Sequence, residues 1–188
     1  MPIRITEKRL KDKRFRDTEE AIVMAFFVLK DKICLKRLIK TAGISRSTLY
    51  RHHENINKIV PDYEEYMVSK YKRFIQRLLK FKRIDLKTLY VQTLSFMSNN
   101  HKIMAFLLEF DNHSFLEEMI GFLKPKIISV SKITDQEVMS IYLKEVVCLI
   151  EEWGRAGFDS KKIDGTVDKI MFLTNTAYFR LSPIKRLA

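Results

Sequence analysis

The stretch LKRLIKTAGISRSTLYRHHENINK, residues 35–58, decides how this chain is expected to fold. Apolar residues recur at spacings of three and four up to Ala42, which predicts a short helix with one apolar side. Gly43 follows, and glycine is the residue best suited to the left-handed conformation in which many helices end. Ser45 is a good N-cap for a second helix over residues 46–52. Two short helices that meet at a glycine predict a helix-turn-helix.

The second of these helices carries polar side chains suited to DNA. Arg46 can form two hydrogen bonds with guanine O6 and N7, and Thr48 can hydrogen-bond to a base or touch a thymine methyl. Arg51 can meet a phosphate or a base, while Tyr50 and His52 are donors long enough for a phosphate oxygen. With Leu49 directed inward, the residues expected to face outward are Arg46, Ser47, Thr48, Tyr50, Arg51 and His52. The alternative is an exposed surface helix without a ligand.

The composition predicts an all-α protein with a substantial core. Of 188 residues, 46% are hydrophobic, which excludes a disordered chain, and only 5 are Gly and 4 are Pro. Cys34 and Cys148 form no CxxC or Cys/His cluster, and we find no signal peptide or apolar run of membrane-spanning length. We therefore expect a cytoplasmic protein without a membrane partner. No Gly-rich phosphate loop, nucleophile elbow or metal-spaced cluster is present, so we expect no enzyme, cofactor or metal.

Positive charge is concentrated in the first third of the chain. Residues 1–60 hold 15 Lys and Arg against 7 Asp and Glu, whereas residues 61–188 hold 20 against 16. Two thirds of the net charge of +12 thus belongs to the first 60 residues. This distribution favours an amino-terminal part that binds a polyanion, followed by a more balanced second part. The alternative is that the basic residues only keep the protein soluble.

Before the helix-turn-helix, we expect a basic arm over residues 1–16 and then a helix. The arm has few apolar anchors, and it is interpreted either as a segment that lies along DNA or as a frayed terminus. Asp17 can cap the helix while Glu20 reaches back in a capping box. Beyond the helix-turn-helix, Pro61 allows two interpretations. Either a helix that begins at Asn55 is kinked, or a separate turn precedes a long helix that begins at Pro61.

Residues 61–188 are expected to form a larger helical domain, which gives about nine helices in all. An apolar stripe predicts a long first helix over residues 62–80, long enough to join two domains. Pro125 is expected to kink or stop one helix, Thr134 to open a later one with a capping box, and Gly165 to interrupt the last. The further helices are expected over residues 85–98, 101–110, 114–123, 134–153 and 160–181.

Tyrosine and methionine side chains at helical spacing in this second domain are candidates to line an effector cavity. The more common role of such residues is simply to fill the core. His101 and His113 lie among apolar residues, where a histidine is usually hydrogen-bonded within the core and less often contacts a ligand. The candidate ligand-binding residues are Tyr66, Tyr90, His101, Met104 and His113.

The run AGISRSTLYRH, residues 42–52, resembles the DNA-binding segment of the tetracycline-repressor (TetR) family of bacterial regulators. The motif covers about residues 17–60, and the rest of the chain agrees with the family in length and helical character. Residues 142–158, with their EEWGRAGF run, are similar to the subgroup that includes the dihydroxyacetone-kinase operon regulators.

The resemblance implies a DNA-binding domain over residues 1–60 and a regulatory and dimerisation domain over residues 61–188. Three amino-terminal helices would read double-stranded DNA, a fourth would join them to the second domain, and the last two helices would form a homodimer. Arg46, Ser47 and Thr48 fall where the family touches base edges and phosphates. The residues expected at DNA are Lys36, Arg37, Ser45, Arg46, Ser47, Thr48, Tyr50, Arg51, His52 and Lys58.

Three positions depart from the family pattern. Cys34 stands where a capping Thr or Ser is usual, and His53 where a core Phe is usual. Ile56 replaces a phosphate-binding Lys, a charge that Lys58 is placed to supply. The function implied is a ligand-responsive transcriptional regulator, more often a repressor, that binds a near-palindromic operator as a dimer. The alternative is a co-regulator of the same fold that binds a metabolite and a partner regulator without touching DNA.

Overall fold

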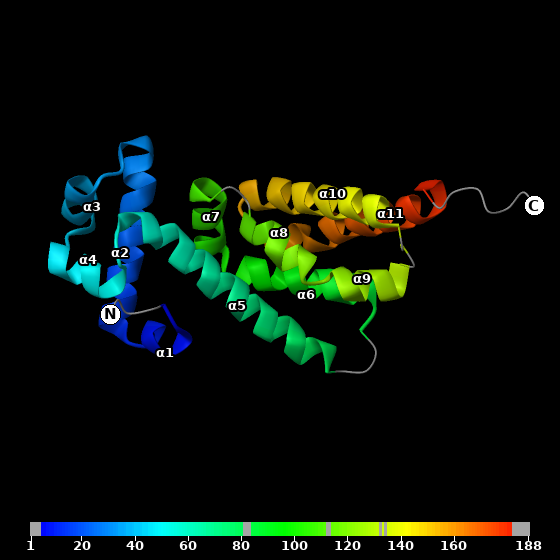
Figure 1. Cartoon of the computed structure of the whole chain (residues 1–188), viewed down its shortest axis with the longest axis horizontal. Helices are drawn as coiled ribbons and strands as arrows, with labels where there is room; N and C mark the ends of the chain where they lie inside the picture. Colours follow the sequence, from blue (N-terminus) through cyan, green and yellow to red (C-terminus); the bar gives the residue numbers. More distant parts are fainter. Residues whose placement is uncertain (1–4, 81–83, 112–113, 132, 134, 182–188) are drawn as a thin grey trace, which may run out of the picture. The chain divides into compact units, whose positions relative to one another are not determined.

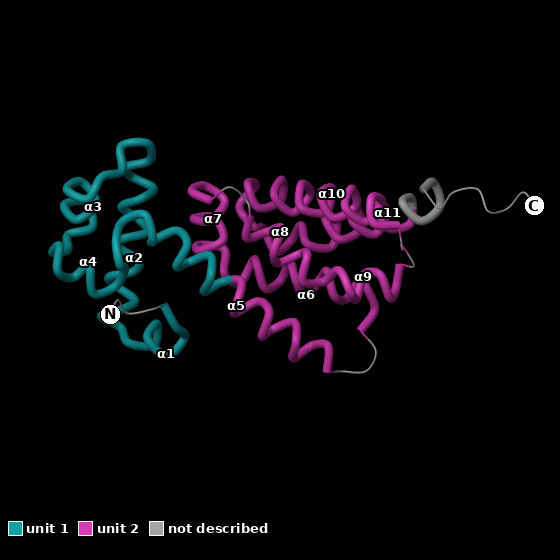
Figure 2. The backbone as a smooth tube through the Cα atoms, in the orientation of Figure 1, with its two compact units in different colours: residues 1–67 teal, residues 68–188 magenta. Residues whose placement is uncertain are grey.

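A computed structural model describes residues 5–80, 84–111, 114–131, 133 and 135–181. Within these ranges the chain forms helices joined by short connections, without a β-strand, which confirms the all-α prediction (Figure 1). The chain divides into two compact units, unit 1 (residues 1–67) and unit 2 (residues 68–188) (Figure 2). In the described part, no helix combines the length and the apolar character needed to cross a membrane.

Unit 1 holds four helices and the first turns of a fifth. A 3-10 turn closes α2, and another precedes α5. The elements in chain order are α1 (Glu7–Leu10), α2 (Lys13–Leu29), η1 (Lys30–Lys32), α3 (Leu35–Ala42), α4 (Arg46–His52), η2 (Ile56–Lys58) and α5 (Ile59–Leu79), which continues into unit 2. The buried residues Ile22 and Phe26 of α2, Leu38 of α3 and Leu49 of α4 contribute to its core.

The start of unit 1 is more ordered than the sequence predicted. Part of the expected arm forms α1, which Thr6 caps, and the neighbouring Ile5 is buried. The expected cap at Asp17 is wrong, because α2 already begins at Lys13. Its cap is Asp12, whose carboxylate accepts hydrogen bonds from the backbone N–H groups of Arg14 and Phe15. This earlier start places Glu19 well inside the helix.

Pro61 neither kinks nor begins the long helix. Residues 56–58 form the separate turn η2, capped by Asn55, and α5 starts at Ile59. Pro61 is therefore the third residue of α5, within the first turn, where a backbone N–H has no partner inside the helix. The second of the two sequence interpretations is closer to the structure, with a helix that begins two residues before the proline.

Unit 2 is a bundle of helices in which α10 and α11 pack together (Figure 1). The helix α10 also packs against α7 and α8, while α11 packs against α6. Large buried side chains, such as Tyr90, Phe106 and Phe115, fill the space between them. The elements are α6 (Leu86–Asn99), α7 (His101–Phe110), α8 (Ser114–Gly121), α9 (Lys124–Ser131), α10 (Gln136–Arg155), η3 (Ser160–Lys162) and α11 (Ile163–Leu181).

Two expectations for unit 2 need correction, and the one for Pro125 is met in part. Pro125 does stop α8, yet it also lies at the second position of a further helix, α9, because a proline is tolerated in a first turn. Asp135 is the N-cap of α10, whereas Thr134, the expected cap, lies outside the described residues. Gly165 does not interrupt the last helix, since it is the third residue of a continuous α11.

Candidate nucleic-acid interface

The backbone of residues 35–52 has the helix-turn-helix geometry that the sequence predicted. Gly43 ends α3 in the left-handed conformation, with φ 64° and ψ 29°. The N–H of Ile44 then reaches back to the carbonyl of Ile39 at 3.0 Å, which closes the helix end. Ser45 caps α4 by accepting a hydrogen bond from the backbone N–H of Thr48 at 3.0 Å. Cys34, by contrast, makes no side-chain hydrogen bond at the start of α3.

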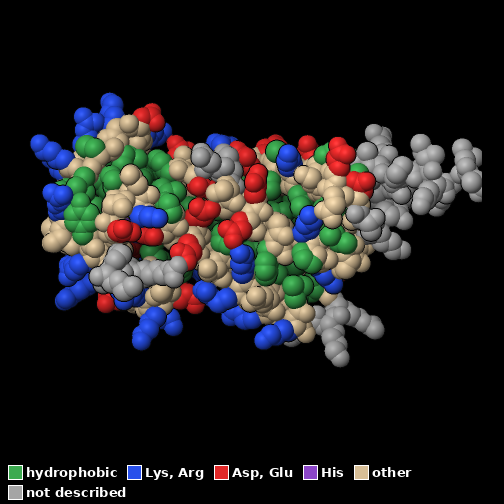
Figure 3. Space-filling model, in the orientation of Figure 1, with side chains coloured by type: hydrophobic (Ala, Val, Ile, Leu, Met, Phe, Trp, Pro, Cys, Tyr) green, Lys and Arg blue, Asp and Glu red, His purple; other side chains and the backbone are tan. Residues whose placement is uncertain are grey.

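The outer side of α3 and α4 is basic. The two helices contain no acidic residue, and their exposed side chains carry several positive charges. Figure 3 shows Lys and Arg side chains on the left of the view, where α3 and α4 lie. Thr48 is half-buried, and the other expected DNA contacts that the structure leaves exposed are Lys36, Arg37, Ser45, Arg46, Ser47, Tyr50, Arg51 and Lys58.

Two of these exposed side chains hold each other in place. The guanidinium group of Arg46 donates from Nη2 to the hydroxyl of Tyr50 at 3.4 Å and lies 5.4 Å from the centre of its ring. A cation above an aromatic face is attracted to it, so this contact restricts the rotamers of the arginine. Ser45 Oγ is 2.8 Å from both Ser47 Oγ and Thr48 Oγ1, which orders the first turn of α4. The polar surface of α4 is therefore organised before any ligand arrives.

The side chain of His52 faces inward, whereas the sequence predicted that it faces outward. The residue is only 8% exposed, and its ring stacks on Phe15 of α2 at a centroid distance of 4.3 Å. Its Nδ1 donates a hydrogen bond to Glu19 Oε1 at 2.6 Å. This placement rules out the expected phosphate contact, because the His52 side chain points from α4 toward α2 and not outward.

A buried polar network lies behind α4. Glu19, 2% exposed, accepts hydrogen bonds at Oε2 from His53 Nε2 at 3.2 Å and from the Tyr63 hydroxyl at 2.5 Å. The other ring nitrogen of His53, Nδ1, is 2.7 Å from Asp62 Oδ2. The network joins α2, the end of α4 and the start of α5. Sequence reasoning overlooked it, although Glu19 shares the 3-and-4 spacing of Phe15, Ile22 and Phe26 and so belongs to the inner face of α2.

The network shifts the pKa values of its members. Burial favours the neutral form of Glu19, but hydrogen bonds from His52, His53 and Tyr63, with the charge of His53, outweigh it and lower the carboxyl pKa to about 2. Burial likewise favours a neutral His53, yet Glu19 and Asp62 hold its pKa above the ordinary value. Burial, together with the Glu19 charge, raises the pKa of Tyr63 well above its ordinary range. Glu19 is thus a buried anion whose hydrogen-bond donors favour its charged form.

Comparisons with family models, curated proteins and solved structures find no match to this chain. Support for a function therefore lies in the chain's own residues and in the chemistry of the exposed helix α4. In the described ranges, no group of three or more His, Cys, Asp or Glu side chains is placed to hold a metal ion.

The candidate effector residues do not share one environment. Tyr66, Tyr90 and Met104 are buried, and the Tyr90 hydroxyl is 2.8 Å from that of Tyr142. The expectation that His101 lies among apolar side chains is wrong, because it is the first residue of α7 and is exposed, with Nδ1 3.1 Å from the carbonyl of Ser98. His113 lies outside the described residues.

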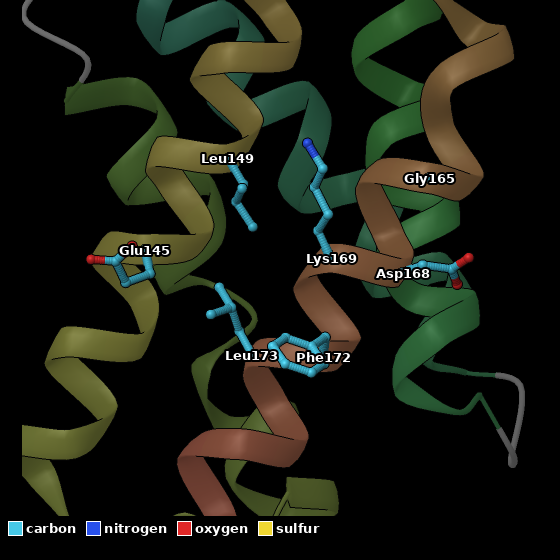
Figure 4. Close-up of a pocket in the computed structure, with 7 residues that line it drawn as sticks. All are labelled: Glu145, Leu149, Gly165, Asp168, Lys169, Phe172 and Leu173. Carbon is cyan, nitrogen blue, oxygen red and sulfur yellow. The ribbon is translucent and has the colours of Figure 1, made fainter.

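A groove of about 440 Å³ lies between α10 and α11. Figure 4 shows Leu149 of α10 and Leu173 of α11 directed into the space between the two helices. Phe172, at its edge, is 68% exposed, which is unusual for so large an apolar side chain. The lining residues are Glu145, Leu149, Gly165, Asp168, Lys169, Phe172 and Leu173.

Proposed function

We propose that this protein is a transcriptional regulator of the TetR type that binds double-stranded DNA through α4 and acts as a homodimer. One observation carries the proposal: an exposed helix-turn-helix whose second helix presents an ordered Arg46 among hydroxyl groups, with no acidic residue on either helix. Basic groups neutralise phosphates, while a planar guanidinium can distinguish guanine by its O6 and N7 atoms. The local resemblance to the family supports the same function.

The assignment of Arg46 to base recognition predicts the effect of removing it. We expect Arg46→Ala to weaken binding to a duplex that the wild-type protein selects from a random pool by about 5- to 150-fold, equivalent to about 1–3 kcal/mol. We also expect relaxed selectivity at one base pair of each half-site. Fluorescence anisotropy titration at fixed salt measures the affinity, and a set of single-base variants of the duplex measures the selectivity.

Lys102→Ala is the matched control for Arg46→Ala, because it also removes one positive charge from an exposed helical position but belongs to α7. We expect it to change the affinity less than twofold. Equal losses in both variants would reduce the role of Arg46 to bulk charge. If no duplex is enriched from the pool, and if affinity for DNA does not fall linearly with salt on logarithmic axes, direct DNA binding is refuted. The co-regulator alternative would then become the leading function.

The groove between α10 and α11 is the surface that we assign to dimer formation. Ile141, 49% exposed, lies one helical turn from Glu145, so an exposed apolar side chain of α10 lies next to the groove. Phe172 supplies an apolar projection on the same side, while Gly165 leaves room for one. A two-fold interface presents the same surface from both subunits, so a projection and a hollow on one surface suit it. Acidic and basic side chains both line the groove. Each subunit can therefore place side chains of one charge opposite side chains of the other charge in a second copy.

A charge placed on this surface is expected to separate the dimer. Phe172→Glu should yield a particle with the monomer mass of 22.4 kDa under conditions in which the wild-type protein has twice that mass. Light scattering after size-exclusion chromatography measures both. Met24→Glu is the control, because Met24 is 61% exposed on a helix of unit 1 and the substitution adds the same charge. A Phe172→Glu protein that stays dimeric would place the interface elsewhere.

The resemblance adds a small-molecule effector to this proposal. A ligand that binds unit 2 more tightly in one arrangement of the dimer would shift the population toward it, and so change the spacing of the two α4 helices. The helix α5 is the covalent connection between the units.

A further inference from the structure

His53 lies between two carboxylates that belong to different helices. The residue is fully buried, and it directly follows α4 in the chain. Its Nε2 is 3.2 Å from Glu19 Oε2 on α2, and its Nδ1 is 2.7 Å from Asp62 Oδ2 on α5. A neutral imidazole has one N–H group and one acceptor nitrogen. Both contacts are hydrogen bonds only when the ring carries two protons and therefore a positive charge.

The surroundings of His53 contain more negative than positive charge. From α2, Glu19 faces the ring, and it also accepts from His52 at 2.6 Å. From α5, Asp62 and the hydroxyl of Tyr63 complete the set, with the Tyr63 ring 6.1 Å from that of His53. With only one proton on the His53 ring, one of the two carboxylates would face a nitrogen lone pair. Such an arrangement is costly because a buried acceptor beside an anion repels it.

We propose that Glu19, His53 and Asp62 form a pH-sensitive latch that positions α4: protonated His53 holds the end of α4 against α2 and α5, and loss of that proton loosens it. Glu19 and Asp62 are positioning residues in this latch, since they act on α4 through His53. The effect on DNA affinity depends on the proposed function, whereas the latch itself does not.

The direction of the pH effect follows from the pKa shifts. The pKa of His53 is raised in the folded protein, so its stabilising contribution is complete below the ordinary histidine value of about 6.5 and is lost as the pH rises through the folded value. The pKa of Glu19 is lowered to about 2, so this residue stays ionised throughout the same range. The latch is therefore closed at a pH below the ordinary histidine value and opens as the pH rises through the raised pKa of His53. Each unit by which the pKa of His53 is raised corresponds to a tenfold change in the equilibrium constant for opening of the latch.

Asp62→Asn tests the latch in the full-length protein. The Asp62 side chain is 28% exposed, so the substitution removes a charge without creating a buried hole. We expect the pKa of His53, followed by NMR of its ring protons, to fall by about one unit. Amide hydrogen exchange of residues 46–52 should then accelerate at a pH lower by the same amount. Asp17→Asn, an exposed substitution on α2, is the matched control and should leave both midpoints unchanged.

His53→Phe provides a second, independent variant, because an aromatic ring of similar size fills the site without titrating. In the wild-type protein, opening of the latch should make the amides of residues 46–52 exchange faster at alkaline pH than their intrinsic pH dependence predicts. We expect this additional increase to be absent in His53→Phe. A His53 that titrates below 6.5 in the wild-type protein, or identical midpoints in wild type and Asp62→Asn, would overturn the latch. DNA affinity is measured in the same variants across this pH range. A protein with the expected NMR behaviour that binds no DNA refutes the proposed function and leaves the latch standing.

Discussion

Replacing Glu19 with alanine is expected to lower the free energy of unfolding of unit 1 by about 3–5 kcal/mol, the range found when one partner of a buried charged pair is removed. The carboxylate is 2% exposed and accepts hydrogen bonds from three side chains that belong to two other segments. Its removal would leave the Tyr63 hydroxyl and the His52 ring without this acceptor inside the core.

The measurement must report on unit 1 by itself. Trp153, the single tryptophan, lies in α10 of unit 2, so its fluorescence follows the other unit. Amide hydrogen exchange of residues in α2 and α4 gives the free energy directly. Glu20→Ala is the control, because Glu20 is the exposed neighbour of Glu19 and its loss should cost less than about 0.5 kcal/mol. A loss below about 1 kcal/mol in Glu19→Ala would contradict the network as described.

The same residue sets the acid limit of unit 1. Since the pKa of Glu19 falls from an ordinary 4.5 to about 2 on folding, its contribution is complete above pH 4.5 and declines as the pH falls toward 2. The shift corresponds to a contribution on the order of 3 kcal/mol. The Glu19→Ala protein should lack this part of the acid dependence.

Leu49→Ala is the second substitution for which we expect a large effect, a loss of about 2–5 kcal/mol in the stability of unit 1. Leu49 is fully buried, and it is one of two buried residues in the seven that form α4. A helix of this length is not stable alone in water, so its position depends on these contacts. We therefore expect α4 to exchange its amide hydrogens faster than α3 in this variant.

Arg51→Ala makes the test of Leu49 specific. Arg51 is exposed on the same helix, so its removal should change stability by less than about 0.5 kcal/mol and weaken DNA binding through the lost charge. Leu49→Ala should change stability first and DNA affinity only as a consequence. If both variants lose stability equally, the orientation of α4 differs from the one described.

The turn between α3 and α4 could be predicted because its causes are local. Gly43 adopts positive φ without a steric penalty, and Ser45 reaches a backbone N–H three residues ahead, so neighbouring residues are sufficient to determine both. The start of α2 was predicted wrongly for a related reason. Asp12 and Asp17 are both competent caps, and the choice between them depends on whether residues 13–16 gain enough from packing to remain helical.

The sequence by itself determined that this chain is all-α, that a helix-turn-helix lies at residues 35–52, and that α4 carries basic and hydroxyl groups, because helical periodicity and capping act over a few residues. Only the tertiary structure decided that His52 faces inward and that Glu19, His53 and Asp62 meet. Glu19 and His53 are 34 residues apart, and the spacing of polar residues along a chain does not say which of them will share a buried site. The outer face of α4 was therefore open to prediction from local chemistry, whereas the network that holds it in place was not.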